Sequence, residues 1–475
     1  MTRDSRRGGS QGRSASRRSA SPRSASPRSA SARSVAVEVM RAVETKDAYA
    51  NLELPALLRR SNLSPADAAF ATELTYGTLR MQGFYDAVIE SAAARRVDTI
   101  DGVVRDILRL GAHQSLTLHT PAHAVVDESA ALARRFGSVG AVGFVNAVMR
   151  RISERDDAEW RSLVTADLAP DDVLSLSSSH PAWIVRALRG ALAHEDSADE
   201  IADLLQSDNL PARVTLVTLS EHAVIPHAES GKYSPRALVL RGGDPHEIEA
   251  VARGSLRIQD EGSQLAALAL TRCRPIRSDE KWLDMCAGPG GKTALLAAES
   301  AGTGVTILAN ESSAHRAELV RQAVKGFPHV NVEVGDGRVI GAAHPHSFDR
   351  ILVDAPCSGL GALRRRPEAR WRRTPQDVAT LTGLQSELLS SALVALKPGG
   401  VLAYVTCSPH LVETRAILNR ALKENPHVHE LDVREVLSRV THDALDLRGT
   451  ELSAQLWPHR HGTDAMFIAL LTTTE

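Results

Sequence analysis

A repeating alternation of short apolar runs and helical stretches, beginning near residue 270, constrains the fold of this chain more than any other feature. The apolar runs lie at 282–285, 305–309, 330–334, 351–353 and 401–405, and the helical stretches at 291–300, 312–325, 376–397 and 410–423. A repeated strand–helix unit predicts a mostly parallel, Rossmann-like α/β sheet with helices on both faces. Ligands bind beyond the carboxyl ends of such strands, so chemically active residues are expected there.

Three segments precede this unit, which makes the chain multidomain. Residues 1–33 form an Arg/Ser-rich tail with too little apolar surface to order, since residues 1–34 hold nine Arg and one Asp. This tail either binds phosphates or acts as a solubilising extension, and the sequence favours neither. Apolar residues at helical spacing in 34–168 predict an all-α bundle of about seven helices, and Ser64-Pro65 predicts a helix N-cap. Residues 169–265 predict a small α+β domain, and the α/β domain spans 266–475.

Composition excludes several classes of protein. No run approaches the roughly 20 apolar residues that span a bilayer, and the start of the chain lacks the apolar region of a secretory signal. Four cysteines are too few and too scattered for a disulfide framework, and they have no paired metal-ligand spacing. The histidines also lack ligand spacing. We therefore expect a cytoplasmic protein with no metal and no membrane association.

The first predicted strand runs into a glycine turn and then a helix. The turn consists of Cys286, Ala287, Gly288, Pro289, Gly290, Gly291 and Lys292. It is not a P-loop, because Cys286 stands where the first glycine is needed. Glu311 after the second strand suits ribose hydroxyls, and Asp336 after the third suits the adenine side. Together these features predict an adenosyl ligand without pyrophosphate, which fits S-adenosyl-L-methionine.

Two cysteines follow the fourth and fifth predicted strands. Cys357 lies in Asp354-Ala355-Pro356-Cys357-Ser358-Gly359, and Cys407 in Thr406-Cys407-Ser408-Pro409. Methylation of carbon 5 of a pyrimidine needs a nucleophile that adds at carbon 6, and a thiolate is well suited to this. Asp354 is placed to stabilise charge on the ring at N3, and a base must then remove the C5 proton.

The same motifs resemble the RNA cytosine-5 methyltransferase family, specifically its ribosomal RNA small subunit methyltransferase B branch. Further matching motifs lie at 259–264 and 461–464, and the helical region is similar to the NusB-like domain of this branch. The resemblance implies a class I methyltransferase domain in which Cys407 is the nucleophile and Cys357 aids release. It also implies cofactor contacts from residues 286–292, Glu311, Asp336 and Asp354. Gly288 stands where the family usually has Ala, and Glu311 where Asp is common.

An arginine-rich stretch next to the Cys357 loop predicts contact with RNA. The expected contacts are Arg364, Arg365, Arg366, Arg370 and Trp371. Arginines bind phosphates, and the tryptophan stacks on a base or braces the loop. The target base must be unpaired or flipped out, because its carbon 5 is otherwise within stacked RNA.

The sequence thus predicts methylation of C5 of a cytidine in small-subunit (16S) ribosomal RNA by a monomer, through a covalent Cys–C6 adduct. One alternative is the same chemistry on transfer RNA, which the catalytic motifs do not distinguish. Another is a non-catalytic RNA-binding or antitermination-type factor. The presence of both Cys357 and Cys407 argues against this second alternative, because a binding protein needs neither thiol.

Overall fold

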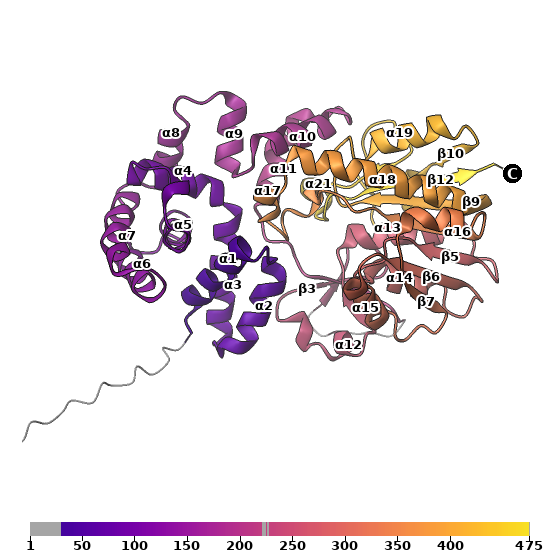
Figure 1. The fold of residues 1–475 in the computed structure, drawn as a ribbon, viewed down its shortest axis with the longest axis horizontal. Helices are drawn as coiled ribbons and strands as arrows, with labels where there is room; N and C mark the ends of the chain where they lie inside the picture. The colour runs from indigo at the N-terminus through magenta and orange to yellow at the C-terminus, as the bar shows by residue number, and fades with distance from the viewer. Residues whose placement is uncertain (1–29, 221–224, 226–227, 475) are drawn as a thin grey trace, which may run out of the picture.

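The computed structural model describes residues 30–220, 225 and 228–474, and Figure 1 shows their arrangement. Helices fill one end of the molecule, a mixed sheet covered by helices fills the other, and a small sheet lies below the larger one (Figure 1). Most of the predicted tail, residues 1–29, lies outside the described residues. The first helix begins at Ala32, capped by Ser31, so the last residues assigned to the tail are helical.

The N-terminal region is helical, as predicted. Its helices are α1 (Ala32–Thr45), α2 (Ala50–Ser61), α3 (Pro65–Arg80), α4 (Gln82–Ala93), the 3-10 turn η1 (Val97–Thr99), α5 (Gly102–Leu116), α6 (Ala122–Phe136), α7 (Val139–Ile152) and α8 (Asp157–Thr165). In α1, apolar residues at helical spacing, such as Val35, Val39 and Val43, face the core. The predicted cap before α3 is confirmed, because the Ser64 hydroxyl accepts a hydrogen bond from the Asp67 amide and Pro65 is the first helical residue.

The middle segment combines helices with a small antiparallel sheet. Its elements are α9 (Pro170–Ser178), α10 (Ala182–Ala193), η2 (Ala198–Glu200), α11 (Ile201–Asp208), β1 (Thr215–Thr218), β2 (Ala228–Ser230), β3 (Ala237–Leu240), η3 (Pro245–Glu247), α12 (Glu249–Ala252) and β4 (Leu256–Ile258). The strands pair in the order β2-β3-β1-β4. Apolar residues of α10 and α11 pack against Leu360, Leu363 and Trp457 of the α/β domain. On its other side the segment contacts the helical domain, where the Gly83 amide of α4 donates to the Ser179 hydroxyl at 2.9 Å, so it bridges the two larger domains.

The α/β domain starts on α13 (Glu261–Arg272), and the boundary predicted after residue 265 falls within that helix. Its further elements are β5 (Lys281–Asp284), α14 (Gly291–Glu299), β6 (Thr306–Glu311), α15 (Ala314–Ala323), β7 (Val330–Val334), η4 (Gly337–Val339), α16 (Ile340–Ala343), β8 (Phe348–Asp354), η5 (Leu360–Ala362), α17 (Ala369–Arg372), α18 (Pro375–Ala395), β9 (Leu396–Thr406), α19 (Arg415–Glu424), β10 (Val428–Leu431), α20 (Val433–Val440), β11 (Ala454–Gln455), α21 (Pro458–His461) and β12 (Phe467–Thr473).

The large sheet has the order β10-β12-β9-β8-β5-β6-β7, with β11 paired to β12. Strands β5 to β9 are parallel, and β12 is antiparallel to both β9 and β10. The five predicted strands are therefore confirmed, and β10, β11 and β12 are additional to them. Because these strands are parallel, the turns after β5, β6, β8 and β9 lie at one edge, and the chain order reverses between β5 and β8, where ligands bind in such sheets.

Helices cover both faces of this sheet, as the strand–helix rhythm predicts. One apolar cluster joins α13, α14 and α20 to one face, and another joins α16, α18 and α19 to the other. Helix α18 is the one helix in the described part of the chain that is long and apolar enough to cross a membrane. Its apolar residues Leu388, Leu389 and Ala392 are buried in the second cluster, so packing on the sheet accounts for its composition.

Candidate active site

The glycine turn after β5 is built for close approach of a ligand. Gly290 has a φ of 99°, a left-handed conformation that favours glycine, and it precedes the first residue of α14. The Gly288 amide donates to a carboxylate oxygen of Glu311 at 3.0 Å, and the Ala287 amide donates to the Asn310 carbonyl at 2.9 Å. These bonds fix the turn against the end of β6.

Glu311 is buried at the end of β6, and both its carboxylate oxygens accept hydrogen bonds from backbone amides. The second oxygen accepts from the Ser313 amide at 3.0 Å. Arg316 lies over this group, because its guanidinium bonds to the Gly288 carbonyl and lies 3.6 Å from Glu311. Asp336 follows β7, where it accepts from the Arg338 amide and pairs with the Arg338 side chain. The structure thus brings the predicted ribose carboxylate to the glycine turn.

A partly buried charge pair lies where β5 and β8 end. The Lys292 ammonium donates to Asp354 at 2.8 Å. Burial opposes the charge on Lys292, but the Asp354 carboxylate outweighs burial and raises the pKa of this lysine. Asp284 is fully buried, and burial raises its pKa to about 7 although it accepts from Thr293 at 2.7 Å. Its other oxygen has no hydrogen-bond partner among the residues that the structure describes.

These residues fit an adenosyl cofactor that carries a positive charge. Glu311 and Asp354 are acceptors for hydroxyl and amino hydrogens, and the unpaired Asp284 oxygen adds a third acceptor at the same strand ends. Because glycine has no side chain, the backbone of the turn is accessible to a ligand. At Gly291, for example, an added Cβ would meet no protein atom nearer than 3.7 Å. The donor set therefore agrees with S-adenosylmethionine, whose carboxylate, ribose and sulfonium need both donors and acceptors.

The thiols of Cys357 and Cys407 are in contact, with their sulfur atoms 3.3 Å apart. Both cysteines are free and partly buried. The hydrogen bond from Cys357 lowers the pKa of Cys407 against the effect of burial, with support from the charges of Lys292 and Arg366. The same hydrogen bond, together with burial, raises the pKa of Cys357 well above its ordinary value. These opposite directions favour Cys407 over Cys357 as the thiolate of the pair.

Cys286 is a different kind of thiol. Burial raises its pKa strongly, and the nearby carboxylates of Asp284, Asp354 and Glu311 add to the increase. It remains a neutral thiol in the wall of the cofactor turn. Its position suits packing against a ligand and not nucleophilic attack.

Glu413 joins the loops of the two cysteines, and the sequence interpretation missed it. This fully buried carboxylate accepts from the Ser358 amide at 2.7 Å, from the Ser358 hydroxyl at 2.5 Å and from the Ser408 hydroxyl at 2.6 Å. It also accepts from Gln385 at 3.1 Å. Ser358 and Ser408 directly follow the cysteines, so Glu413 fixes the distance between the thiols. In the sequence, the one signal for this role is that a serine directly follows each of the two cysteines.

We expect Glu413→Leu to lower methyl transfer about 100-fold with little change in cofactor affinity, because displacement of a reacting group by about 1 Å costs this much. Glu413→Gln is the matched control, since the serine hydroxyls can rotate to accept from the amide, and it should retain activity within about tenfold. Single-turnover rates and calorimetric titration with S-adenosylmethionine measure both quantities. Equal losses of activity in the two variants would contradict the proposal that Glu413 fixes the distance between the thiols.

The predicted RNA contact by Arg370 is wrong. Its side chain is completely buried, and burial lowers its pKa to about 10. It donates to the carbonyls of Arg80, Asp208 and Ser179 at 3.0, 2.9 and 3.3 Å, and to the Asn209 side chain at 2.7 Å. These partners belong to the helical domain and the middle segment, so Arg370 connects all three domains and cannot reach a phosphate.

The side chains of Arg364 and Arg365 are also bound to other groups of the protein. Arg364 is buried and donates to the Gly462 carbonyl at 2.8 Å. Arg365 pairs with Asp260 at 2.8 Å and with Asp464 at 3.0 Å. These contacts tie the arginine-rich stretch to the motifs at 259–264 and 461–464. The buried Arg364 does not fit the predicted phosphate contact, and Arg365 would have to leave two carboxylates to make one.

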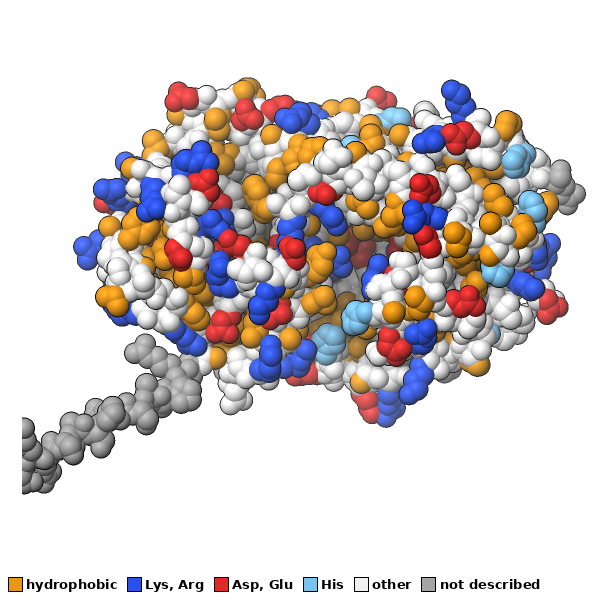
Figure 2. Space-filling view, in the orientation of Figure 1, with side chains coloured by type: hydrophobic (Ala, Val, Ile, Leu, Met, Phe, Trp, Pro, Cys, Tyr) orange, Lys and Arg blue, Asp and Glu red, His pale blue; other side chains and the backbone are white. Residues whose placement is uncertain are grey.

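Arg366 and Trp371 are the exposed members of the predicted RNA-binding set. The Trp371 ring lies against Gly83 of α4, where an added Cβ would come within 2.3 Å of the ring, and 40% of the residue remains exposed. Trp371 therefore braces the loop, one of its two predicted roles. On the face shown in Figure 2, basic and acidic side chains are mixed, so the exposed arginines do not belong to a large basic patch there.

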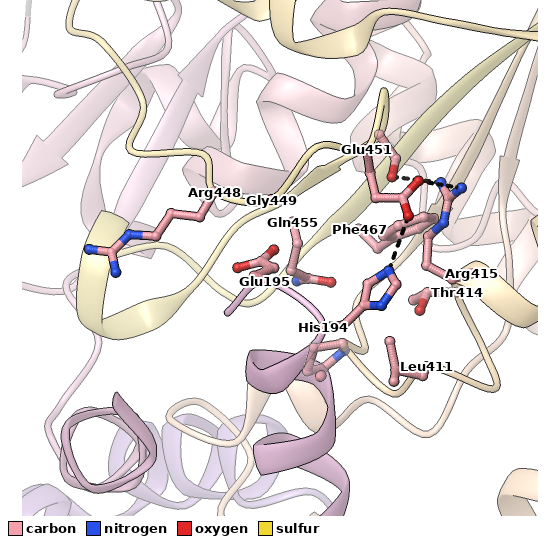
Figure 3. Close-up of a pocket in the computed structure, with 13 residues that line it drawn as sticks. His194, Glu195, Leu411, Thr414, Arg415, Arg448, Gly449, Glu451, Gln455 and Phe467 are labelled. Atoms are coloured by element: carbon pink, nitrogen blue, oxygen red, sulfur yellow. Dashed lines mark hydrogen bonds and ion pairs between the residues drawn. The ribbon is translucent and has the colours of Figure 1, made fainter. Parts of the chain in front are cut away.

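A separate pocket lies where the middle segment meets the loop after Cys407 (Figure 3). His194 at the end of α10 lies 3.3 Å from Glu451, which also pairs with Arg415 at 2.7 Å. Pro409 lines it, whereas the predicted cofactor and catalytic residues do not. We interpret the pocket as a gap at the interface between the middle segment and the α/β domain. Within residues 30–220, 225 and 228–474, no group of three or more His, Cys, Asp or Glu is placed to hold a metal ion.

The pKa difference between the two thiols makes a testable prediction. Because the pKa of Cys407 is lowered and that of Cys357 is raised, iodoacetamide should label Cys407 first, with a pH–rate inflection below the value of about 8.5 for free cysteine. Lys292→Met removes a charge that lowers the pKa and leaves Asp354, which raises it. The inflection should then rise by about one pH unit. Lys281→Met, at the exposed start of β5, is the control, and mass spectrometry identifies the labelled cysteine. Preferential labelling of Cys357 would contradict the assignment.

Comparison with known proteins agrees with this geometry. Residues 273–472 match the family 16S rRNA methyltransferase RsmB/F, and residues 30–154 match the NusB family. A Mycobacterium tuberculosis protein named as a methyltransferase, Rv1407, is 47% identical over 92% of this chain and 95% of its own length. A Bacillus subtilis protein named as a ribosomal RNA small subunit methyltransferase B is 30% identical over 91% of this chain and 97% of its own length.

The fold also has a counterpart among solved structures. The crystal structure of PH0851 superposes with a TM-score of 0.75 over 92% of this chain and 97% of that chain, at 22% sequence identity. The similarity therefore extends over almost the whole arrangement of domains.

Proposed function

The chain belongs to the RsmB/F family of 16S rRNA methyltransferases, and from this premise we propose that it methylates C5 of a cytidine in small-subunit ribosomal RNA. The observation that carries the proposal is the contact between the Cys357 and Cys407 sulfurs, 3.3 Å apart, next to the Lys292–Asp354 pair. C5 methylation needs two groups of this kind, one to add to the ring and one to assist release.

The cofactor in this proposal is S-adenosylmethionine, which supplies an electrophilic methyl group. Glu311 accepts hydrogen bonds from the ribose, and the turn at 286–292 surrounds the methionine part. Asp336 contacts the adenine side. The charge of Lys292 acts on Cys407, which supports a position of the methyl group near the nucleophile when the cofactor is bound.

Cys407 attacks C6 of the cytosine as a thiolate, which forms the S–C6 bond and moves the C5=C6 electron pair onto C5. Asp354 stabilises the charge that develops at N3 if it holds a proton or shares the one on Lys292. Carbon 5 takes the methyl group, and the bond between that methyl and the cofactor sulfur breaks. The lowered pKa of Cys407 supports this assignment, because it raises the thiolate fraction near neutral pH.

Release requires loss of the C5 proton and cleavage of the S–C6 bond, which restores the C5=C6 double bond and the Cys407 thiolate. Cys357 assists this step, since its sulfur is within reach of Cys407 and its thiol stabilises the leaving thiolate by a hydrogen bond. The different roles of the two cysteines agree with the opposite directions of their pKa shifts.

Ribosomal RNA is favoured over transfer RNA by the names of the relatives and by the NusB-type helical domain. A non-catalytic RNA-binding role is disfavoured, because Glu413 and Cys357 form an arrangement around Cys407 that binding alone does not need. The cytoplasm, where ribosomes are assembled, is the proposed location.

Bisulfite sequencing of total RNA from a strain that lacks the gene tests the proposal. One cytidine of the small-subunit RNA should lose its protection from conversion, and expression of the wild-type chain should restore it. Loss of protection in a transfer RNA would support the alternative substrate. An unchanged pattern in all RNAs would refute cytosine-5 methylation.

A further inference from the structure

The segment that follows the Cys357 loop is docked onto the first turn of α2 and the residues before it. The buried Glu368 carboxylate accepts from the Ala50 amide at 3.2 Å. Arg372 donates to the carbonyls of Val43 and Ala48 at 2.5 and 2.6 Å. These contacts place the residue between them, Tyr49, against the arginine-rich stretch.

Tyr49 supports the guanidinium of Arg366. The Arg366 group lies 5.2 Å from the centre of the Tyr49 ring, and that of Arg372 lies 5.4 Å from it. Both distances are within the range of cation–π attraction. Arg366 is exposed and forms no side-chain hydrogen bond or ion pair with the residues that have described positions. The ring of Tyr49 is therefore what restrains this guanidinium.

Arg366 belongs to the same local structure as the nucleophile. The Gly361 amide donates to the Cys407 carbonyl at 2.9 Å, and the Arg366 amide donates to the Ala362 carbonyl at 3.0 Å. The charge of Arg366 is also among those that lower the pKa of Cys407. A guanidinium that is exposed, unpaired and adjacent to the nucleophile has the properties of a phosphate ligand.

We propose that Tyr49 is a positioning residue that holds Arg366 at the edge of the active site, where its guanidinium binds a phosphate of the RNA next to the target cytidine. The helical domain then completes the substrate site of the α/β domain. This inference rests on the proposed function, because the phosphate belongs to the RNA substrate.

The test uses the full chain and a transcript of the small-subunit RNA segment that contains the modified cytidine. Tyr49→Ala should raise the Kd and KM for RNA about tenfold and leave kcat within about twofold. The slope of log Kd against log salt should become shallower by about 0.7, the value for one phosphate contact on a single strand. Arg366→Met should raise the Kd and KM and reduce the salt slope in the same way, and it should also lower kcat, because its charge helps to lower the pKa of Cys407. The double variant should bind RNA no more weakly than Arg366→Met alone, because both changes remove one contact.

Two further variants separate positioning from general damage. Tyr49→Phe keeps the ring and should bind RNA like the wild type. Leu52→Ala, in the first turn of α2 at a residue that is 67% exposed, should also be unchanged. Additive effects of Tyr49→Ala and Arg366→Met, an unchanged salt slope in Tyr49→Ala, or equal damage in Tyr49→Phe would overturn the inference. If the wild type does not methylate this RNA, the proposed function itself fails; if it does and Tyr49→Ala behaves identically, only the inference fails.

Discussion

Cys407→Ala should reduce methyl transfer by roughly a thousandfold or more while S-adenosylmethionine still binds, because the variant lacks the atom that adds to C6. Cys357→Ala should instead accumulate a covalent protein–RNA adduct, since addition remains possible and release is slowed. Denaturing gel electrophoresis with end-labelled RNA detects the adduct, and incorporation of labelled methyl groups measures the transfer.

Cys273, which lies outside the contact and outside the cofactor turn, provides the comparison. Cys273→Ala alters a thiol that packs beside Arg350, far along the chain from either cysteine loop, and should methylate RNA normally. The double variant Cys357→Ala/Cys407→Ala should form no adduct. An adduct in Cys407→Ala that disappears in the double variant would mean that Cys357 is the nucleophile, and the two roles would have to be exchanged.

The strand ends that form the site were predictable because the information is local. Each parallel strand is an apolar run followed by turn residues, so Glu311, Asp354, Cys357 and Cys407 could be assigned to one edge before their distances were known. The antiparallel strands β10 and β12 were not predicted. They lie beyond the last regular strand–helix unit, and β12 inserts between β9 and β10 by pairing that no local pattern reveals.

The errors concern residues whose partners are distant in the sequence. In the sequence, Arg370 is one of six arginines in the arginine-rich stretch and resembles a surface charge. In the structure it is enclosed by three carbonyls, from the last residue of α3, the residue after α9 and the last residue of α11. A buried guanidinium needs such partners, because an unpaired buried charge is strongly unfavourable. Glu413 was missed for the same reason, since its role exists only after Ser358 and Ser408 have been brought together.

Gly288 and Glu311, two departures from the usual family pattern, are explained by each other in the structure. A Cβ on residue 288 would lie 2.4 Å from a Glu311 oxygen and 2.8 Å from Nε of Arg316. The additional methylene of Glu311 thus brings its carboxylate into the space that an alanine methyl would fill. A shorter Asp at position 311 would withdraw from that space.

Gly288→Ala should therefore weaken S-adenosylmethionine binding by roughly 5- to 150-fold, because overpacking of a buried site costs about 1–3 kcal/mol. Glu311→Asp should also weaken binding, since the shorter carboxylate loses the Gly288 amide. The double variant should bind about as well as Glu311→Asp alone, because the shorter carboxylate removes the 2.4 Å contact that makes the methyl group of residue 288 costly beside Glu311. The coupling in this double-mutant cycle should exceed about 1 kcal/mol by calorimetric titration. Gly326→Ala, outside the cofactor turn at a glycine where an added Cβ would meet nothing within 4 Å, is the control. Losses that simply add in the double variant would show that the two residues are independent, and the carboxylate length would then not explain the glycine.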